Sequence, residues 1–151
     1  MLEELPGVSL KVIGFVKNGI RQRPDSGWEK IVSEITIVSS QAEALDGLEE
    51  FSHIIVIYWM HQVSPLAQVP TKIHPSGRQD LPLVGLFATR TPHRLNPVGA
   101  TVVRLLERRD NVLKVKGLDA LDGSPVIDIK PYMPKRDAIS DARTPLWEKK
   151  L

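Results

Sequence analysis

Short runs of branched apolar residues recur along the chain and predict strands rather than long helices. Val8 to Val16 and Lys30 to Val38 are rich in such side chains, and the segment between them carries the Gly and Pro expected of a loop. His53 to His61 (HIIVIYWMH) is apolar at both odd and even positions. A strand with this pattern is covered on both faces, so this segment is expected to be central.

The second half of the chain continues the strand pattern. Val98 to Glu107 and Asn111 to Val115 are predicted strands, and the RRDN sequence between them has the polar content of a hairpin turn. Val126 to Ile129 predicts a further short strand. The apolar run from Leu83 to Phe87 is interpreted as a core strand that delivers a polar loop to the rim of the fold, where binding residues often lie.

Helical and loop signals fill the gaps between the predicted strands. Ser39 and Ser40 can cap a short helix that runs through Leu45 and is closed by Gly47. The segment from Gln62 to Leu81 is rich in Ser, Pro, Thr, Gln and Gly and shows neither strand nor helix periodicity. It therefore predicts a long surface loop of the functional or disordered kind.

These elements together indicate an all-β fold, namely a small antiparallel or mixed β-barrel with one or two short helices. The barrel domain is expected to cover residues 1–136. Residues 137–151 form a charged tail in which Leu146 and Trp147 are the only expected anchors.

Composition narrows the classes of function. The chain has 151 residues, the length of one domain, and no cysteine, which excludes a thiolate nucleophile, an iron–sulfur cluster and a cysteine zinc site. The formal charge of +2 permits an anionic partner without requiring one. Neither a signal peptide nor a membrane-length apolar run is visible, so a cytoplasmic protein is expected. The dinucleotide fingerprint, the phosphate loop and metal-ligand histidine spacing are also missing, so neither a Rossmann enzyme nor a metal site is expected.

Two stretches gather the side chains best suited to chemistry, PLVGLFATRTPHRLN and GLDALDGSPVIDIKPYMP. The first brings four polar residues into one short loop: Arg90, His93, Arg94 and Asn96. The forked guanidinium of an arginine can hold a carboxylate or phosphate group of a ligand. The alternative is that Arg90 and Arg94 cap backbone carbonyls or pair with Asp119 or Asp122 of the second stretch.

Three segments closely resemble motifs of the TrmO family, also called the YaeB or TsaA-like family: GLEEFSHIIVIYWMHQ, VGLFATRTPHRLNPVG and GLDALDGSPVIDIKPYMP. The resemblance covers most of the region from Ile13 to Pro134. It implies a homodimeric β-barrel methyltransferase that uses S-adenosyl-L-methionine. The implied reaction methylates N6 of threonylcarbamoyladenosine, beside the anticodon of certain transfer RNAs.

The resemblance assigns cofactor binding to seven positions: His61, Gln62, Arg90, Ala100, Gly117, Leu118 and Asp119. Arg90 is the candidate for the cofactor carboxylate, because its planar fork can hold both oxygens. Asp119, with Asp122 as second choice, suits the ribose hydroxyls or the ammonium group, because an ionised aspartate accepts several hydrogen bonds. Backbone groups at Gly117 and Leu118 suit the adenine edge, where small side chains allow close approach.

The implied chemistry needs alignment more than covalent help. Methyl transfer is an in-line displacement, so a near-attack geometry can supply most of the acceleration. Asp122 and Tyr132 are the catalytic candidates, because the N6 proton must leave. Phe87 or Tyr132 is the candidate stacking platform for a splayed base. Transfer RNA contacts are expected from four side chains: Arg78, Arg94, Asn96 and Lys130.

Several polar residues are expected to be structural. His93 is interpreted as a surface or turn residue, and His53 as a satisfied group at the start of a buried strand. Asp128 is expected to hold backbone or to pair with Lys130.

The chain departs from the family pattern in two places. A PRQPG-like segment is replaced by RQRPDSGW, with Asp25, Ser26 and Gly27 at the corresponding positions, and no sizeable extension follows the KPY motif. These departures keep a second hypothesis open, a non-catalytic module that binds S-adenosyl-L-methionine or a nucleotide. A homodimer is expected from the resemblance and from three apolar residues around the long loop: Trp59, Leu66 and Val69.

Overall fold

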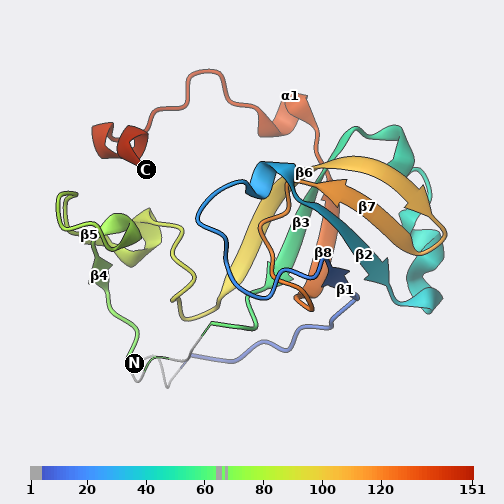
Figure 1. Cartoon of the computed structure of the whole chain (residues 1–151), viewed down its shortest axis with the longest axis horizontal. Coiled ribbons are helices and arrows are strands. Elements are labelled where there is room, and N and C mark those ends of the chain that lie inside the picture. Colours follow the sequence, from blue (N-terminus) through green and yellow to red (C-terminus); the bar gives the residue numbers. More distant parts are fainter. Residues whose placement is uncertain (1–4, 64–65, 67) are drawn as a thin grey trace.

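The computed structural model describes residues 5–63, 66 and 68–151 and shows a closed barrel of six strands. The order around the barrel is β1-β2-β7-β6-β3-β8, and neighbouring strands run antiparallel (Figure 1). The predicted small β-barrel is therefore confirmed. The six strands are β1 (Gly14–Lys17), β2 (Val32–Ile37), β3 (His53–Trp59), β6 (Val98–Arg109), β7 (Val112–Lys116) and β8 (Pro125–Pro131).

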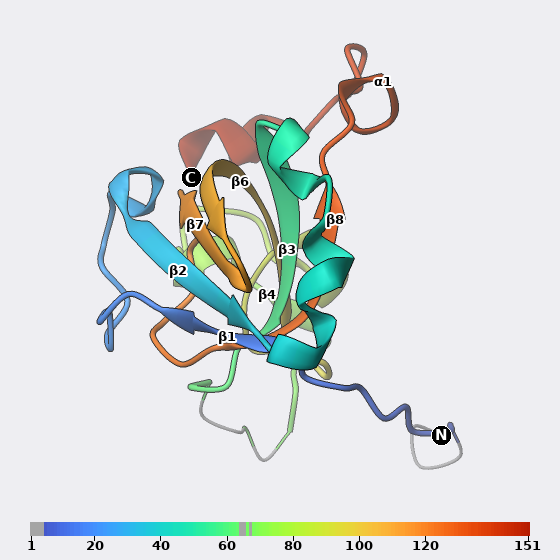
Figure 2. The same ribbon diagram turned by 90° about the vertical axis from the view of Figure 1, so that its right-hand side faces the viewer.

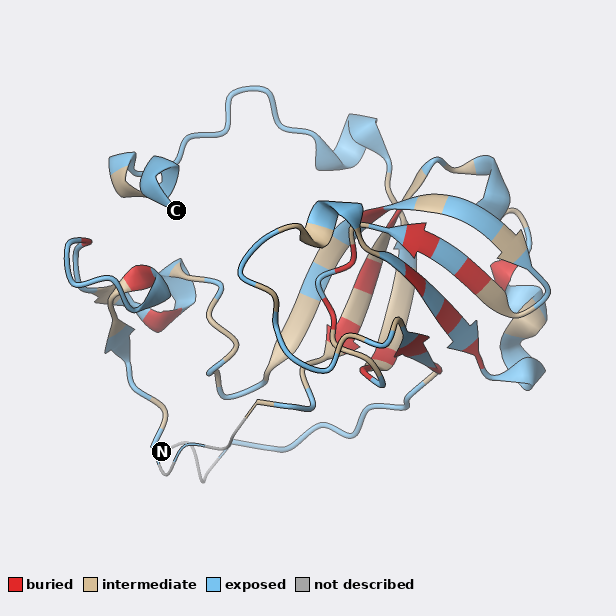
Figure 3. Ribbon diagram, viewed as in Figure 1, coloured by how far each residue is buried: buried red, intermediate tan, exposed pale blue. Residues whose placement is uncertain are grey.

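The barrel interior is built by alternate residues of each strand, because successive side chains of a strand point to opposite faces. In β2 every second residue is buried, and the same alternation holds in β3. Ile35, Ile54 and Leu113 are fully inaccessible at 0% exposure. Figure 3 shows these buried positions as a striped pattern along the barrel strands. Closure of the sheet therefore creates the main hydrophobic core.

The hairpin of β6 and β7 is confirmed where the RRDN sequence predicted it. Arg109 pairs with Val112, and Asp110 in the turn adopts a left-handed φ of 52°. β3 is central, as predicted, because it pairs with both β6 and β8. Its outward side chains are half-buried rather than covered, so the prediction of two buried faces was wrong for the outer face.

Two other strand predictions were too long, and the one from Lys30 to Val38 corresponds to β2 (Val32–Ile37). The predicted strand from Val8 to Val16 begins only at Gly14, and Val8 is 83% exposed. The reason is where the pairing ends: β2 stops at Ile37, opposite Gly14, and β1 pairs with β8 only through Gly14 and Phe15. Ile13 still donates to the Val126 carbonyl and accepts from the Val38 amide, whereas the earlier apolar residues Val8, Leu10 and Val12 are exposed.

Short 3₁₀ helices cover one side of the barrel beside β3 and β8 (Figure 2). These are η3 (Ser39–Leu45) and η4 (Leu48–Glu50); a third, η2 (Trp28–Lys30), precedes β2. The predicted serine cap was wrong, because Val38 holds the N-cap position of η3 and no side chain caps it. Gly47 has a φ of 86° and starts η4 instead of closing a longer helix. Arg108 of β6 fastens η3 by donating to the Ala42 carbonyl at 3.0 Å.

Residues 71–89 form a separate extension that we call the arm (Figure 1). It contains β4 (Lys72–Ile73), η5 (Pro75–Gly77), β5 (Val84–Gly85) and η6 (Leu86–Ala88), and β4 and β5 pair only with each other. The predicted core strand from Leu83 to Phe87 was therefore wrong. Leu83 is 55% exposed and Phe87 is 78% exposed, because this run supplies a two-residue strand and a 3₁₀ turn outside the barrel.

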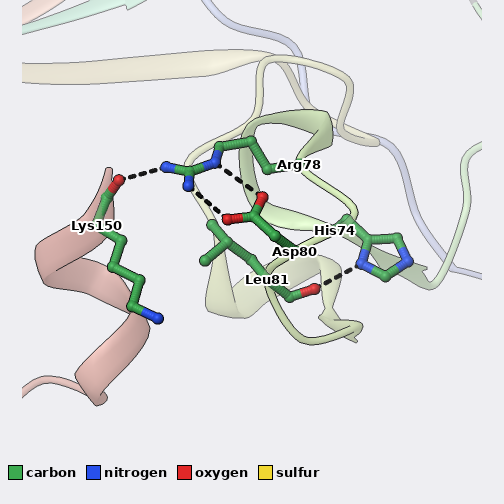
Figure 4. Close-up of polar contacts among 5 residues, drawn as sticks. All are labelled: His74, Arg78, Asp80, Leu81 and Lys150. Carbon is green, nitrogen blue, oxygen red and sulfur yellow. Dashed lines mark hydrogen bonds and ion pairs between the residues drawn. The ribbon is translucent and has the colours of Figure 1, made fainter.

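The arm has its own small set of buried residues, Pro75, Leu81 and Leu86, which do not belong to the barrel core. Figure 4 shows the polar contacts that hold it: His74 Nδ1 lies 2.8 Å from the Leu81 carbonyl oxygen. The predicted long loop from Gln62 to Leu81 is thus partly structured; residues 64, 65 and 67 lie outside the described residues.

The C-terminal segment contains α1 (Pro134–Asp137) and η7 (Leu146–Lys150). Arg78 of the arm donates to the Lys150 carbonyl at 2.5 Å and to the Asp80 carboxylate at 2.6 Å (Figure 4). Leu146 is 84% exposed, so its predicted role as an anchor was wrong, whereas Trp147 is half-buried. Within the described residues, no helix has the length and apolar character needed to cross a membrane.

Candidate functional site

A cavity of about 770 Å³ lies between the end of β3, the first half of β6 and the loop that joins the arm to β6. Its polar lining includes three kinds of side chain: the arginines Arg23, Arg90 and Arg94, the acid Asp119, and the hydroxyls of Tyr58 and Thr101. Both stretches of chain that flank the arm, residues 60–63 and 90–94, contribute to the lining. The cavity is therefore assembled from segments that are far apart in sequence.

Asp119 is the acidic group of this cavity, and two hydroxyls hold it. Tyr58 Oη donates to Asp119 Oδ1 at 2.9 Å, and Thr101 Oγ1 donates to the same oxygen at 2.5 Å. Asp119 lies after β7, and its neighbours come from β3 and β6. The carboxylate is an acceptor for hydrogen bonds, so it suits ligand groups that donate them.

Tyr58 is fixed by close packing as well as by its hydrogen bond. Its side chain is 4% exposed and lies opposite Gly99 across the β3–β6 pair. A Cβ atom at Gly99 would lie 2.4 Å from the tyrosine ring, so only glycine leaves room for it. Burial, and then the charge of Asp119, raise the pKa of Tyr58 well above its usual range, so the phenol stays a donor.

The two arginines of the predicted cluster play different roles. Arg94 donates to the carbonyls of Thr89 at 2.9 Å and Thr91 at 3.1 Å, and its guanidinium lies 6.0 Å from the centre of the Phe87 ring. The structural alternative therefore applies to Arg94, which caps its own loop. For Arg90, no hydrogen bond or ion pair to other described residues is found, and its exposed side chain lines the cavity.

Asp122 is engaged by the backbone. Its Oδ1 accepts the amide of Asn18 at 2.8 Å and the amide of Gly19 at 3.0 Å, and these bonds hold the pKa of this carboxyl below its usual range. Asp122 does not line the cavity. In this geometry Asp122 stabilises the loop that follows β1. Its predicted catalytic role stays a prediction.

Of the seven predicted cofactor positions, five line the cavity: His61, Gln62, Arg90, Ala100 and Asp119. Gly117 and Leu118 lie outside the lining; the Gly117 amide donates to the Ile31 carbonyl at 3.0 Å, and Leu118 is 0% exposed in the barrel core.

The other predicted site residues also lie outside the lining, namely Asn96, Lys130 and Tyr132. Lys130 pairs with Asp128 at 2.9 Å, which confirms the interpretation of Asp128. The Tyr132 ring packs edge-on against the His53 ring at 6.3 Å. His53 also contacts Ser52 Oγ at 2.7 Å, as expected of a structural residue.

Other lining residues were not predicted from the sequence, among them Arg23, Trp28, Tyr58, Met60 and Thr101. Arg23 and Trp28 belong to the RQRPDSGW segment that departs from the family pattern, while Asp25, Ser26 and Gly27 of the same segment lie outside the lining. The inward parity of β3, shared by Ile54, Val56 and Tyr58, was the available signal for Tyr58. The arrangement as a whole offers three cations, one acceptor carboxylate and an indole, which suits a ligand with both anionic and donor groups.

Comparisons with known proteins identify relatives of this chain. The model of the tRNA-methyltransferase O N-terminal domain matches residues 17–138. A curated relative from Archaeoglobus fulgidus, an S-adenosyl-L-methionine-binding protein, is 43% identical over 135 residues, covering 87% of this chain and 94% of the relative. The Escherichia coli tRNA (adenine(37)-N6)-methyltransferase is 41% identical over 107 residues, covering 68% of this chain and 45% of that enzyme.

The fold comparison gives the same result. The crystal structure of TrmO from Pseudomonas aeruginosa matches with a TM-score of 0.74 and 35% identity, over 93% of this chain and 62% of that chain. The chain also spans only 38% of another Archaeoglobus fulgidus relative, a probable S-adenosyl-L-methionine-binding protein that is 40% identical over 145 residues. Since the family model covers most of its length, the chain belongs to the tRNA-methyltransferase O N-terminal domain family.

Proposed function

We propose that this chain binds S-adenosyl-L-methionine in the cavity beside Asp119 and methylates N6 of an adenine in transfer RNA. The observation that carries the proposal is the placement of Arg90, His61 and Asp119 in one cavity, within a fold shared with TrmO structures. The volume of about 770 Å³ lies within the range of small-molecule sites.

The residues of the cavity fit this cofactor by their chemistry. When bound, the cofactor supplies an electrophilic methyl group on a sulfonium. Arg90 offers a cationic fork for its carboxylate, and Asp119 offers an acceptor for its ribose hydroxyls or its ammonium. The two groups have opposite charge, as a zwitterionic ligand requires. The chain itself binds and aligns the reactants, which is the main demand of an in-line displacement.

We further propose that the substrate base is threonylcarbamoyladenosine next to the anticodon. Arg23 and Arg94 line the same cavity as Arg90, which gives it more cationic groups than one cofactor carboxylate needs. The threonyl part of this base carries a carboxylate of its own. A cavity with surplus arginines favours a substrate with an anionic group.

Nucleoside mass spectrometry tests the reaction directly. Transfer RNA with and without threonylcarbamoyladenosine is incubated with the protein and deuteromethyl S-adenosyl-L-methionine. Label on that nucleoside alone supports the full proposal, and label on another adenine keeps the methyltransferase and overturns the substrate. A protein that binds the cofactor without labelling any RNA contradicts the proposed reaction.

Calorimetry with an arginine pair tests the cofactor site. Arg90→Ala should weaken S-adenosyl-L-methionine binding by about tenfold or more, because a charge-assisted contact is lost. Arg109→Ala is the matched control, since this side chain is 78% exposed on the β6–β7 hairpin and should leave affinity unchanged. Both variants should unfold at nearly the wild-type temperature. Equal affinity of the Arg90 variant and the wild type would remove Arg90 from the site.

A second candidate is a module that binds the cofactor without catalysis. The observation in its favour is that this chain matches S-adenosyl-L-methionine-binding proteins of similar length but spans only 45% of the Escherichia coli enzyme. It predicts tight cofactor binding and no turnover on any RNA. The labelling experiment separates the two candidates.

The homodimer stays a prediction. Leu66 is 45% exposed, and Trp59 and Val69 are half-buried. Multi-angle light scattering at micromolar concentration should give twice the chain mass of 16.9 kDa. A monomer peak would contradict it.

A further inference from the structure

Two hydroxyl groups from different strands converge on one oxygen of Asp119. Tyr58 comes from β3 and Thr101 from β6, and both donate to Oδ1, at 2.9 Å and 2.5 Å. Asp119 itself lies on the segment after β7. Among the described residues, Oδ2 takes part in no hydrogen bond or ion pair. One carboxylate oxygen is thus used internally, and the other is left for an outside donor.

Neither hydroxyl can serve as donor to a ligand while it holds Asp119. Each carries a single proton, and that proton is directed to Oδ1. Tyr58 Oη also lies 3.2 Å from the Asp119 backbone carbonyl oxygen, so both hydrogen-bond acceptors of the phenol belong to Asp119. The two residues therefore act on a ligand through Asp119.

The barrel fixes this arrangement before any ligand arrives. Tyr58 and Gly99 face each other across the β3–β6 pair, and the missing side chain at Gly99 makes space for the tyrosine ring. Thr101 is two residues further along the same strand as Gly99. A carboxylate held between two such strands loses little freedom on binding, which improves affinity.

We propose that Tyr58 and Thr101 are positioning residues that hold Asp119 Oδ1 so that Oδ2 receives a hydrogen-bond donor of the cofactor, a ribose hydroxyl or the ammonium group. The inference rests on the proposed cofactor site. It assigns a function to two residues to which the family resemblance gave no role. The two hydroxyls and the carboxylate between them then act as a single unit.

Calorimetry with hydroxyl-deleting variants tests the unit. Tyr58→Phe and Thr101→Val should each raise the dissociation constant of S-adenosylhomocysteine about threefold to tenfold, because Asp119 loses a contact that fixes it and must then be ordered when the ligand binds. Thr101→Ser keeps the hydroxyl and should bind within about twofold of wild type. Thermal unfolding of every variant reports whether it is folded. Wild-type affinity in both deleting variants would overturn the inference, whereas a wild-type protein that does not bind would overturn the proposed cofactor site.

Ligand analogues distinguish positioning from a general structural role. The loss of affinity caused by Tyr58→Phe and by Thr101→Val is measured with three ligands. These are S-adenosylhomocysteine, an analogue that lacks the α-amino group, and the 2′,3′-dideoxy analogue. If the two residues act through Asp119, their penalty disappears for the analogue that lacks the donor facing Oδ2. That result also identifies the donor. An equal penalty with all three ligands would overturn the inference.

Tyrosine NMR tests the contact without any ligand. The chain contains two tyrosines, so ¹³Cζ-labelled protein gives two signals, and Tyr132→Phe assigns them. The charge of Asp119 helps to raise the pKa of Tyr58, so Asp119→Asn should make Tyr58 titrate at lower pH than in the wild type. An unchanged titration would show that the two groups are not in contact in solution, which overturns the inference.

Discussion

The barrel and the arm differ in how they use apolar residues. The barrel strand VLKVK buries Leu113 and Val115 at 0% exposure, because its apolar residues alternate with lysines on a pleated strand. The arm segment LVGLF is more continuously apolar, yet Leu83 and Phe87 are exposed. Burial is thus decided by alternation and by neighbouring strands, and continuous apolar character alone does not place a segment in the core.

The two regions also differ in their share of the main core and in their position relative to the cavity. The barrel holds the large core, whereas the arm is an insertion between two stretches that line the cavity, residues 60–63 and 90–94. The arm keeps its shape through its own buried residues and through hydrogen bonds such as that of Leu86 to the Thr71 carbonyl at 2.9 Å. Substitutions in the barrel should therefore change folding, and substitutions in the arm should leave it nearly unchanged.

The largest expected effect comes from truncation of a core leucine. Leu113→Ala should lower the free energy of unfolding by about 2–5 kcal/mol, because a fully buried side chain leaves a cavity. Phe87→Ala in the arm, at 78% exposure, should cost less than about 1 kcal/mol. Urea denaturation measures both. Equal losses would show that the arm shares the barrel's folding unit.

A pair of glycines gives the next largest contrast. Gly99→Ala places a Cβ 2.4 Å from the Tyr58 ring and should destabilise the barrel by about 1–3 kcal/mol through overpacking. Gly85→Ala in the arm is the matched control, because its φ is −60° and nothing lies within 4 Å of the added atom. Its free energy of unfolding should stay within about 0.5 kcal/mol of wild type. An unchanged free energy of unfolding for Gly99→Ala would mean that the Tyr58 ring can adopt another position.

The elements that the sequence predicts correctly are those defined by local patterns. The β6–β7 hairpin and β2 were predictable, because local alternation and turn residues are enough to define them. The start of β1 was not, since Val8 to Val16 is rich in apolar residues throughout, and the first paired residue is set by the end of β2 at Ile37, opposite Gly14. Pairing partners distant in sequence carry that information.

The site shows a similar limit. Arg90 and Asp119 were predicted through a family resemblance, which also named Gly117 and Leu118, now found outside the cavity lining. Tyr58 and Thr101 were missed because their meeting with Asp119 depends on the register of β3 against β6. No local pattern encodes a contact between residues 61 positions apart.

Acid titration compares carboxylates of the two regions. The pKa of Asp122 is lowered in the folded barrel by the amides of Asn18 and Gly19, so its stabilising contribution is present above the ordinary carboxyl range and is lost as pH falls through the lowered value. Asp122→Asn should therefore lower Tm by a few degrees at pH 7 and match wild type in strong acid, where the wild-type carboxyl is also neutral.

The matched carboxylate is Asp80 of the arm, whose pKa is lowered mainly by its hydrogen bond from Arg78. Asp80→Asn should leave the unfolding temperature of the barrel unchanged at both pH values, because the pair is exposed and lies outside the main core. Thermal scans at pH 7 and in acid strong enough to neutralise the Asp122 carboxyl decide the comparison. A difference at pH 7 that persists unchanged in acid would assign the Asp122 effect to shape rather than charge.

The smallest effect is expected where the arm meets the C-terminal segment. Arg78 donates to the Lys150 carbonyl and to Asp80, so Arg78→Ala removes a link between the arm and η7 without touching the barrel core. Tm should stay within about a degree, while limited trypsin digestion should cut after Lys149 about twofold to fivefold faster, because a less anchored segment opens more often. Arg109→Ala controls for the loss of one exposed arginine. Unchanged cleavage would mean that Trp147 holds the segment by itself. A fall in Tm as large as that of Leu113→Ala would mean that the arm and the barrel fold as one unit, which contradicts their separate contributions to stability.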